Sequence, residues 1–538
     1  MRGDVCVVGA GAAGLMAAVA AAQAGASVLV VSKDPPGQGG ASPICGGGFI
    51  GAWRGLSAEE HAARTFETGR GLNRPELVAA LVEDAPARLQ QLLDWGLRTV
   101  APLRAGSMVA AGSGPRRGSE VVRCLHERAL ALGVRFASGL VVRSIRAGGE
   151  GASLAAFDTA SAGWQAIACG ALVLAAGGGA AMFARHDTAE QITGDAFALA
   201  LGAGARLQDM EFVQFYALAL DMPELPRAII PGPVLDLGRL VNDRGEDLLD
   251  KHGLERRLPA VRARDRLAQA LYRELKEGRE VLVDFRAADA AAWNADPQTA
   301  GSWTFFRDTC GVLERPLRIA PAAHYVVDGV SFRPDASTDV PGLFVAGETG
   351  GGLHGANRMG ENSLSETVVF GHRAGCAAAA FAKVAGRADP DLEALIPRGP
   401  SGIARSAADI LAGIRATLWE CGGIERRPED MARGSAAIAA LREEADQMPA
   451  GEAPADLALR LQAQMAARSA AVVLGAALRR EESRGAHLRA DHPTSDDARW
   501  LGHVCARADG DGLAWSFEPR SPMRQPALAA AAGPQGWH

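Results

Sequence analysis

The sequence predicts an α/β fold built around a parallel β-sheet, and two patterns carry this prediction. The N-terminal stretch reads strand–turn–helix–strand, with the β-branched run DVCVV, the turn GAGAAG, the small-residue helix LMAAVAAAQAG and the strand ASVLVVSK. Two later apolar runs, ALVLAAGGG at 171–179 and PGLFVAGETGG at 341–351, also end in glycines. Strands buried on both faces of a parallel sheet read as such unbroken apolar runs, and they present ligand contacts at their carboxyl ends.

Composition narrows the class of protein. Of the 538 residues, 48% are hydrophobic and 22% are charged, which fits a globular chain of two to four domains rather than a disordered one. The formal net charge of −6 provides no basic surface, so we expect no nucleic-acid partner.

Cysteines and apolar segments exclude further classes. None of the eight cysteines lies in a C-x-x-C pair, so we expect no zinc site, no iron–sulfur cluster and no other metal site in this chain. Glycines interrupt the apolar N-terminal stretch, and no unbroken apolar run is long enough for a transmembrane helix. The expectation is a reduced, cytoplasmic protein, with a peripheral membrane role left open.

The order of the patterns predicts one domain inserted into another. A mixed segment with its own helix and the strand EVLVDF separates the second and third apolar runs, and an Ala/Glu/Arg-rich helical segment follows. We expect the last fifty residues to be irregular and the tail after Pro522 to be loosely held. The expected domains are 1–205 and 325–385 for the two parts of the nucleotide-binding domain, 206–324 for an inserted α+β capping domain, 386–485 for a helical domain and 486–538 for a small C-terminal region.

The turn GAGAAG has the G-x-G-x-x-G spacing of a dinucleotide-binding loop. In such a loop Gly9 makes the tight turn, Gly11 lets the backbone approach a pyrophosphate, and Gly14 allows close helix–strand packing. The following helix start offers free amides and a partial positive charge. Because the motif follows a strand and opens a helix, it predicts a Rossmann-like dinucleotide site rather than a glycine-rich helix start without a ligand.

One feature of such sites is missing. Ser32 and Lys33 stand where a carboxylate usually ends the second strand, which counts against a plain nicotinamide site. Glu348, just past the third strand, is the candidate to hold the ribose hydroxyls instead.

Further motifs carry a family resemblance. GAGAAG, GQGGAS at 37–42, TGD at 193–195, HYVVDGV, GLFVAGE, HGANRMGENSL at 354–364, and ESRGAH and DDARWL near the C-terminus resemble, in order, the succinate dehydrogenase/fumarate reductase flavoprotein family, which includes L-aspartate oxidase. The resemblance spans essentially the whole chain. It implies a Rossmann-like FAD-binding domain with an inserted capping domain, and FAD as the cofactor.

The resemblance also implies how FAD is held. The start of the helix at ENSL would place backbone amides beside the isoalloxazine, where reduction develops negative charge. The stretch SKDPPGQGG lacks the histidine that bonds covalently to the flavin in respiratory members, and His61 lies well beyond it, so we expect dissociable FAD. The expected cofactor contacts are Gly9, Gly11, Ala12, Ala13, Gly14, Ser32, Lys33, Gly39, Gly40, Ala41, Gly177, Asp195, Glu348, Asn362, Ser363 and Leu364.

The family exchanges hydride between flavin N5 and a carbon beside a carboxylate. By resemblance His324 and Arg358 bind one substrate carboxylate, and bidentate guanidinium geometry suits that role. Arg264 matches the family's proton-donating arginine, an unusual acid because its pKa lies near or above about 12. The alternatives are a solvated helix face for Arg264, which lies among six arginines between 256 and 273, and a structural histidine for His324.

Other positions depart from the family. The family's Q-F-H-P-T-G reads Gln214 to Ala219 here, so Tyr216 replaces the histidine that holds the second carboxylate, and a tyrosine carries no charge at neutral pH. The Thr-Glu pair falls on Ile230 and Pro231, the relay arginine on Val234, and only Asp236 keeps an acid nearby. We therefore expect a small carboxylate substrate with one carboxylate and a more apolar end, so succinate and fumarate should be poor substrates.

The leading interpretation is an FAD-dependent dehydrogenase or reductase acting on a carbon–carbon bond beside a carboxylate. Three alternatives remain open: an L-aspartate oxidase-like amino-acid oxidase, a flavoprotein subunit working with an iron–sulfur or other electron-transfer partner, and an FAD-binding protein without catalytic activity.

Overall fold

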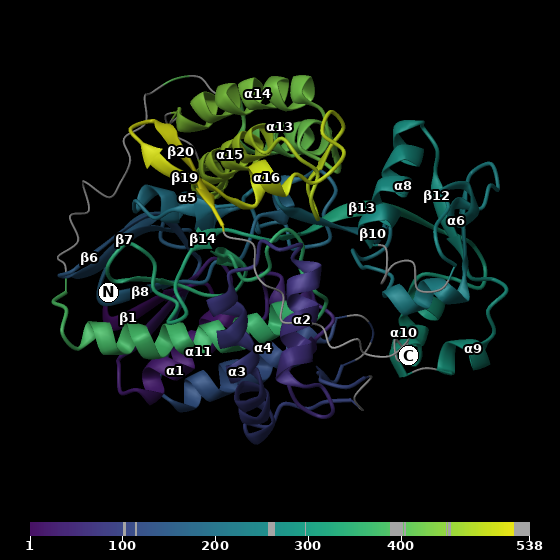
Figure 1. Cartoon of the computed structure of the whole chain (residues 1–538). Helices are drawn as coiled ribbons and strands as arrows, with labels where there is room; N and C mark the ends of the chain where they lie inside the picture. Colours follow the sequence, from purple (N-terminus) through teal and green to yellow (C-terminus); the bar gives the residue numbers. More distant parts are fainter. Residues whose placement is uncertain are drawn as a thin grey trace.

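The computed structural model describes residues 1–520 except 101–103, 113, 115, 257–263, 296, 388–401, 403–404, 448 and 450–452. Its central sheet has parallel strands in the order β5-β2-β1-β8-β15, which confirms the predicted α/β class. Strands β1 and β8 are labelled in Figure 1. The antiparallel strands β7 and β6 extend the same sheet from β8. The strands of this sheet are β1 (Arg2–Val8), β2 (Val28–Ser32), β5 (Arg135–Ser138), β6 (Leu140–Gly148), β7 (Gly151–Asp158), β8 (Gly163–Leu174) and β15 (Leu343–Val345).

Helices cover this sheet (Figure 1), and β3 (Gly48–Ile50) and β4 (Ser107–Val109) form a separate two-stranded antiparallel sheet. The sequence places the three glycine-ended apolar runs on β1, β8 and β15, which are neighbours, so their carboxyl ends meet at one edge. The helices of this part are α1 (Ala12–Gln23), α2 (Ala58–Thr68), α3 (Pro75–Asp94), α4 (Gly118–Ala131), α5 (Asp195–Gly202) and α11 (Asn362–Ala382).

Two of these helices, α1 and α11, lie in unusually close contact. A Cβ added at Gly371 would lie 2.7 Å from the Ala13 carbonyl oxygen, and one at Gly375 would lie 2.2 Å from that of Ala17. These contacts follow the same order along both helices, so the helices run parallel (Figure 1). Their N-termini therefore lie at the same end of the domain, where each helix has amides without intrahelical acceptors.

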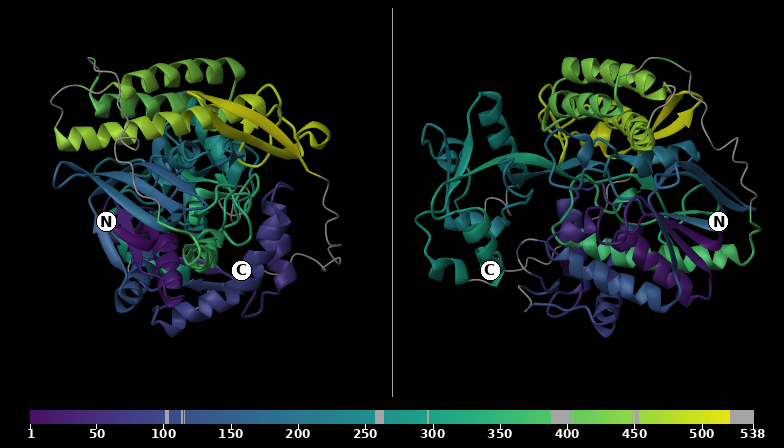
Figure 2. Two further views of the ribbon diagram at one scale, coloured as in Figure 1. Left: turned by 90° about the vertical axis from the view of Figure 1, so that its left-hand side faces the viewer. Right: turned by 180° about the vertical axis from the view of Figure 1, so that it is seen from behind.

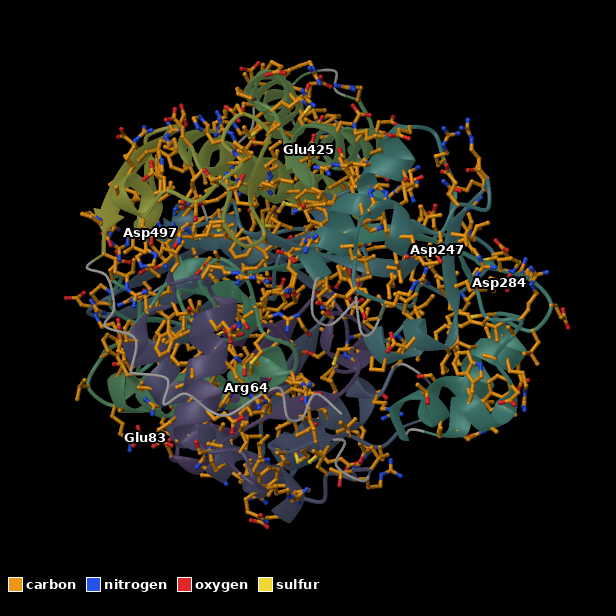
Figure 3. All side chains as sticks on the ribbon, turned by 45° about the vertical axis from the view of Figure 1, so that its right-hand side comes forward. Arg64, Glu83, Asp247, Asp284, Glu425 and Asp497 are labelled. Carbon is orange, nitrogen blue, oxygen red and sulfur yellow. The ribbon has the colours of Figure 1, made fainter. Side chains whose placement is uncertain are left out.

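The inserted segment forms a separate lobe, at the right of Figure 1, that is joined to the sheet domain by β10 and β13. Its sheet is antiparallel in the order β10-β13-β12-β11. Asp247 and Asp284 mark this lobe in Figure 3, apart from Glu425 and Asp497 in the C-terminal part. The lobe contains β10 (Val213–Leu220), β11 (Arg239–Asn242), β12 (Val281–Asp284), β13 (Leu317–Val326), α6 (Leu248–Lys251), α8 (Arg264–Lys276), α9 (Ala290–Asn294) and α10 (Pro297–Thr304).

Three long helices form the C-terminal helical part, which covers the top of the molecule in both views of Figure 2. They are α13 (Ala407–Cys421), α14 (Pro428–Asp446) and α15 (Pro454–Arg479). Helix α15 is long and apolar enough to cross a membrane, but 78% of its most apolar window is buried inside the protein, as expected of a core helix. It is the one such helix among the residues that the structure describes.

The last fifty residues are not irregular, and that prediction was wrong for 502–519. Here β19 (Gly502–Asp509) and β20 (Gly512–Pro519) form a hairpin, and β19 adds to β9 (Leu207–Gln208). The hairpin was missed because β20 is largely exposed and carries only a weak alternation of apolar residues. The predicted loose tail after Pro522 lies outside the described residues. The remaining strands and α-helix are β14 (Val330–Ser331), β16 (Gly350–Gly351), β17 (Glu425–Arg426), β18 (Leu488–Arg489) and α16 (Asp497–Trp500).

Candidate active site

The loop between β1 and α1 has a backbone geometry that excludes a side chain at two of its three glycines. Gly9 has a φ of +112°, and a Cβ there would lie 2.2 Å from the Ala175 carbonyl oxygen. A Cβ on Gly14 would lie 2.0 Å from the Gly9 carbonyl oxygen, so any side chain would force helix and strand apart. Around Gly11 the nearest atom to an added Cβ is the Ser42 hydroxyl at 3.1 Å. Backbone is thus packed against backbone at the first and third glycines but not at the second.

Other expected cofactor residues surround this loop. The Ala12 amide donates to the Ser42 hydroxyl at 3.0 Å, and Gly40, with φ of +81°, has open space where a Cβ would stand. Lys33, at the end of β2, pairs with Asp195 at 2.6 Å. These contacts join the carboxyl ends of β1 and β2 to the start of α5, so these predicted positions lie in one cluster.

Glu348 lies buried just past β15. Its Oε1 accepts a hydrogen bond from the Val326 amide at 3.0 Å, and it fills the space that a Cβ on Gly178 would need. Burial raises the pKa of Glu348 to about 8, although the Val326 amide and the positive charge of Arg358 oppose the rise. At neutral pH this carboxyl is therefore largely protonated, and it can donate as well as accept hydrogen bonds.

At the start of α11 the side chain of Asn362 is held by the protein itself. His61 Nε2 donates to Asn362 Oδ1 at 2.8 Å, and Asn362 Nδ2 donates to the Thr65 hydroxyl at 3.0 Å. The preceding residue, Glu361, has a φ of +68°. The helix start is thus fixed by side-chain contacts to α2, which leaves its first-turn amides for a ligand.

Arg358 is buried and held by Gln214. Its Nη2 donates to Gln214 Oε1 at 2.8 Å, while Gln214 Nε2 donates to Asn357 Oδ1 at 2.8 Å and to the Arg358 carbonyl at 3.0 Å. The guanidinium carbon lies 4.5 Å from the centroid of the Tyr325 ring. These contacts fix the guanidinium plane, which suits a group that must meet a carboxylate in one orientation.

The buried carboxylate of Glu366 links the motif that contains His354 and Arg358 to the motif that contains His324 and Tyr325. Glu366 Oε2 accepts from the Tyr325 hydroxyl at 2.8 Å and from His354 Nε2 at 2.9 Å. Glu366 comes from α11, Tyr325 from β13 and His354 from the glycine-rich loop before α11. This network sets the position of the loop that carries Arg358 relative to the strand that carries His324.

His324 lies on β13, and Asp187 holds its ring. Its Nδ1 is 2.8 Å from Asp187 Oδ2, with 4% of the Asp187 side chain and 26% of the His324 side chain exposed. The ring of Tyr216 lies 5.6 Å from the His324 ring, centroid to centroid. The Tyr216 hydroxyl donates to the Ile230 carbonyl at 3.0 Å. The charges of Asp187 and Arg358 both act on the Glu348 carboxyl, which therefore lies between the two predicted substrate residues electrostatically.

A pocket borders this region on the side of the lobe. It is lined by Gln214, Asn357 and, from α8, Asp265 and Gln269, together with residues of the C-terminal part. Arg264 is the first residue of α8, and its side chain lies outside the described residues.

Comparison with known proteins decides the family. A model described as FAD binding domain matches residues 4–364, and one described as fumarate reductase flavoprotein C-term matches residues 412–525. This chain belongs to the succinate dehydrogenase/fumarate reductase flavoprotein family. It is an FAD-dependent oxidoreductase acting on carbon–carbon bonds, as the sequence predicted.

Individual relatives match over nearly their full length. A fumarate reductase flavoprotein subunit of Mycobacterium tuberculosis is 31% identical over 95% of each chain. An L-aspartate oxidase of Streptomyces coelicolor is 30% identical over 94% of this chain and 92% of its own. The solved E. coli quinol fumarate reductase flavoprotein has a TM-score of 0.86 at 26% identity, over 98% of each chain.

The flavoprotein holds functional candidates that sequence reasoning missed. Asp187 and Glu366 are buried carboxylates that contact His324 and Tyr325, and Gln214 orients Arg358. Their partners lie 137, 41 and 144 residues away, so no local pattern reveals the pairs. The one signal in the sequence was an acidic residue close to a recognised motif, which holds for both Asp187 and Glu366.

Proposed function

We propose that this flavoprotein exchanges hydride between FAD and a carbon beside a single substrate carboxylate, and that succinate and fumarate are poor substrates. The observation that carries the proposal is the contact between the Tyr216 hydroxyl and the Ile230 carbonyl, 3.0 Å long and beside His324. Family resemblance implies a charged clamp for a second carboxylate at these positions. A neutral pair stands there instead, and it suits an uncharged substrate end.

The residues proposed to hold the substrate carboxylate are Arg358 and His324. When bound, FAD supplies a hydride acceptor or donor at its N5. Arg358 provides the fixed guanidinium, oriented by Gln214 at 2.8 Å, and burial strengthens its interaction with an anion. The cluster of glycine loops and helix starts fits the cofactor, with Gly9, Gly11 and Gly14 and the remaining expected contacts as the proposed FAD-binding residues.

Arg264 is the proposed proton donor by resemblance. Supporting this, the next residue of α8, Asp265, lines the same pocket as Gln214 and Asn357, which contact each other beside Arg358. A guanidinium is a weak acid, so such a role needs close positioning against the substrate carbon. If Arg264→Gln turns over substrate at the wild-type rate, Arg264 has no part in proton transfer.

The direct test is anaerobic bleaching of the flavin absorbance by a panel of carboxylates. Saturated monocarboxylates with an apolar end are expected to bleach the flavin, whereas succinate should do so slowly or not at all. Robust fumarate reduction by the dithionite-reduced protein would contradict the proposal. Bleaching by none of the panel would favour an FAD-binding protein without catalytic activity.

An L-aspartate oxidase-like activity is the second candidate, supported by the 30% identical Streptomyces coelicolor relative. The Tyr216–Ile230 pair counts against it, because L-aspartate carries two carboxylates. Rapid bleaching by L-aspartate, with reoxidation by air or fumarate, would establish this second activity and overturn the first.

We infer that FAD is held without a covalent bond. His61 is hydrogen-bonded to Asn362, and burial lowers its pKa, so it is a neutral structural residue. Acid precipitation should release the yellow cofactor into the supernatant; flavin that stays with the pellet would contradict this inference.

We also infer an electron-transfer partner that supplies iron–sulfur clusters, and through it a cytoplasmic enzyme with peripheral membrane association. The Mycobacterium tuberculosis relative is named a flavoprotein subunit. No group of three or more possible metal ligands occurs in the part of the chain that the structure describes, so clusters would come from the partner. Purification from the native source should recover stoichiometric iron with the flavin; a lone, iron-free and fully active chain would refute this.

A further inference from the structure

Asp187 is the unassigned group that most directly affects the substrate-binding histidine. Its carboxylate, 4% exposed, lies 2.8 Å from His324 Nδ1. Backbone hydrogen bonds fix this pair: the Ala323 amide donates to the Arg185 carbonyl at 2.8 Å, and the Asp187 amide donates to the Ala323 carbonyl at 3.2 Å. The segment that carries Asp187 is therefore attached to β13 directly beside His324.

An ionised carboxylate only accepts hydrogen bonds, so it keeps the proton of His324 on Nδ1. A neutral ring then presents the lone pair of Nε2 on its other side. Nε2 has no partner among the described residues, and that side of the ring is the one left for substrate. A lone pair repels a carboxylate, whereas an imidazolium offers an N–H.

We propose that Asp187 makes substrate binding depend on proton uptake by His324: the carboxylate ligand binds the imidazolium form, with Nδ1 on Asp187 and Nε2 on the ligand. This proposal rests on the proposed function, in which His324 meets a substrate carboxylate. One proton is taken up for each ligand bound, and no bond other than N–H forms or breaks. Asp187 is thus a positioning residue that couples affinity to pH.

Other titratable groups lie near His324 and Asp187. Tyr216, on β10, faces the ring with a phenol whose hydroxyl donates to the Ile230 carbonyl. Burial, reinforced by Arg227, lowers the pKa of His186 on the neighbouring segment to about 4, so it stays neutral above that pH. Glu348, which burial keeps protonated up to about 8, also gains negative charge as pH rises, and it remains in any Asp187 variant.

The test compares the FAD-loaded wild type, Asp187→Asn and the control Asp221→Asn, whose carboxylate pairs with Arg185 instead. Crotonate, a short monocarboxylate, serves as probe, and its Kd is read from the change in flavin absorbance between pH 6 and 9. For wild type and Asp221→Asn, Kd should rise with pH, by up to about tenfold per pH unit, as expected when one proton is taken up with the ligand. For Asp187→Asn, Kd should stay within about twofold, because an asparagine amide can donate to Nδ1 and leave the ring proton on Nε2.

Two outcomes overturn the proposal: a flat wild-type profile, or the same slope in Asp187→Asn, which would assign the effect to Glu348. A second measurement, the ¹⁵N NMR spectrum of labelled histidines with His324→Gln for assignment, needs no ligand. Wild type should show Nδ1 protonated and Asp187→Asn should show Nε2 protonated. If crotonate binds at no pH, the single-carboxylate function fails, and identical tautomers in the two proteins would still refute the role of Asp187.

Discussion

The proposed cofactor cluster and the proposed substrate pocket of this flavoprotein depend on different kinds of contact. At the cofactor cluster the geometry depends on the absence of side chains, since a Cβ on Gly9 or Gly14 would meet a backbone carbonyl at 2.2 or 2.0 Å. At the substrate pocket it depends on side chains from distant segments, such as His324 with Asp187 and Arg358 with Gln214. Close backbone contacts permit few residue types at a position, whereas one substitution can change the shape and charge of a pocket lined by side chains. The first region therefore keeps the family pattern and the second departs from it.

The largest effect should come from a side chain in the cofactor loop. Gly14→Val places carbon atoms against the Gly9 carbonyl, where there is room for none, and overpacking of this kind costs about 3 kcal/mol. We expect flavin content to fall at least about tenfold and the melting temperature to drop. Gly202→Ala is the control, because nothing lies within 4 Å of a Cβ added at Gly202. Normal flavin absorbance in purified Gly14→Val would break the comparison.

The next effect belongs to the charged end of the substrate pocket. Arg358→Gln removes a buried guanidinium, and the loss of such a partner costs about 4 kcal/mol, or about 10³-fold in kcat/KM. Flavin content should stay near the wild-type level, because no expected FAD contact is changed. Arg373→Gln, which removes a partly exposed partner of Asp84, is the matched control on the same part of the chain. Equal losses in both variants would mean that Arg358 acts through stability rather than binding.

A smaller gain is expected at the neutral end of the pocket. Tyr216→His should raise the rate of flavin bleaching by succinate about tenfold, because a hydrogen bond to a charged group contributes about 1.5–3 kcal/mol. Activity with monocarboxylates should fall as the pocket becomes more polar. Stopped-flow bleaching with both classes of substrate measures the change. An unaltered preference would show that Tyr216 does not determine specificity.

The smallest effect is the pH dependence of stability that Glu348, which lies between the two regions, should cause. Burial raises the pKa of Glu348 to about 8 from 4.5, so between these values the folded protein holds a proton that the unfolded chain has lost. The contribution of Glu348 to the free energy of unfolding is therefore largest below about pH 4.5. It falls as the pH rises to about 8, by at most about 1.4 kcal/mol per pH unit. Relative to Glu348→Gln, urea unfolding of the wild type should show this extra slope between pH 5 and 8. Parallel profiles would rule it out.

The same division explains what the sequence could predict. The α/β class and a dinucleotide site follow from GAGAAG and the glycine-ended strands, since their spacing is dictated by backbone geometry. The family and FAD were implied by the resemblance that further motifs such as HGANRMGENSL carry. Asp187, Glu366 and Gln214 could not be predicted, because each acts on a residue brought near only by folding. The hairpin of β19 and β20 was missed for a related reason: β19 is stabilised by pairing with β9, about 300 residues earlier in the chain. The roles of the individual site residues stay predictions.

Strand β13 connects the inserted lobe directly to the proposed active site. Its first half is hydrogen-bonded to β12 within the lobe, and its last residues carry His324 and Tyr325 into the sheet domain. The Ala323 amide and carbonyl are bonded to the 185–187 segment, so a tilt of the lobe would bend β13 before His324 rather than move the ring. The lobe could therefore open for a ligand while the histidine proposed to bind it stays in place.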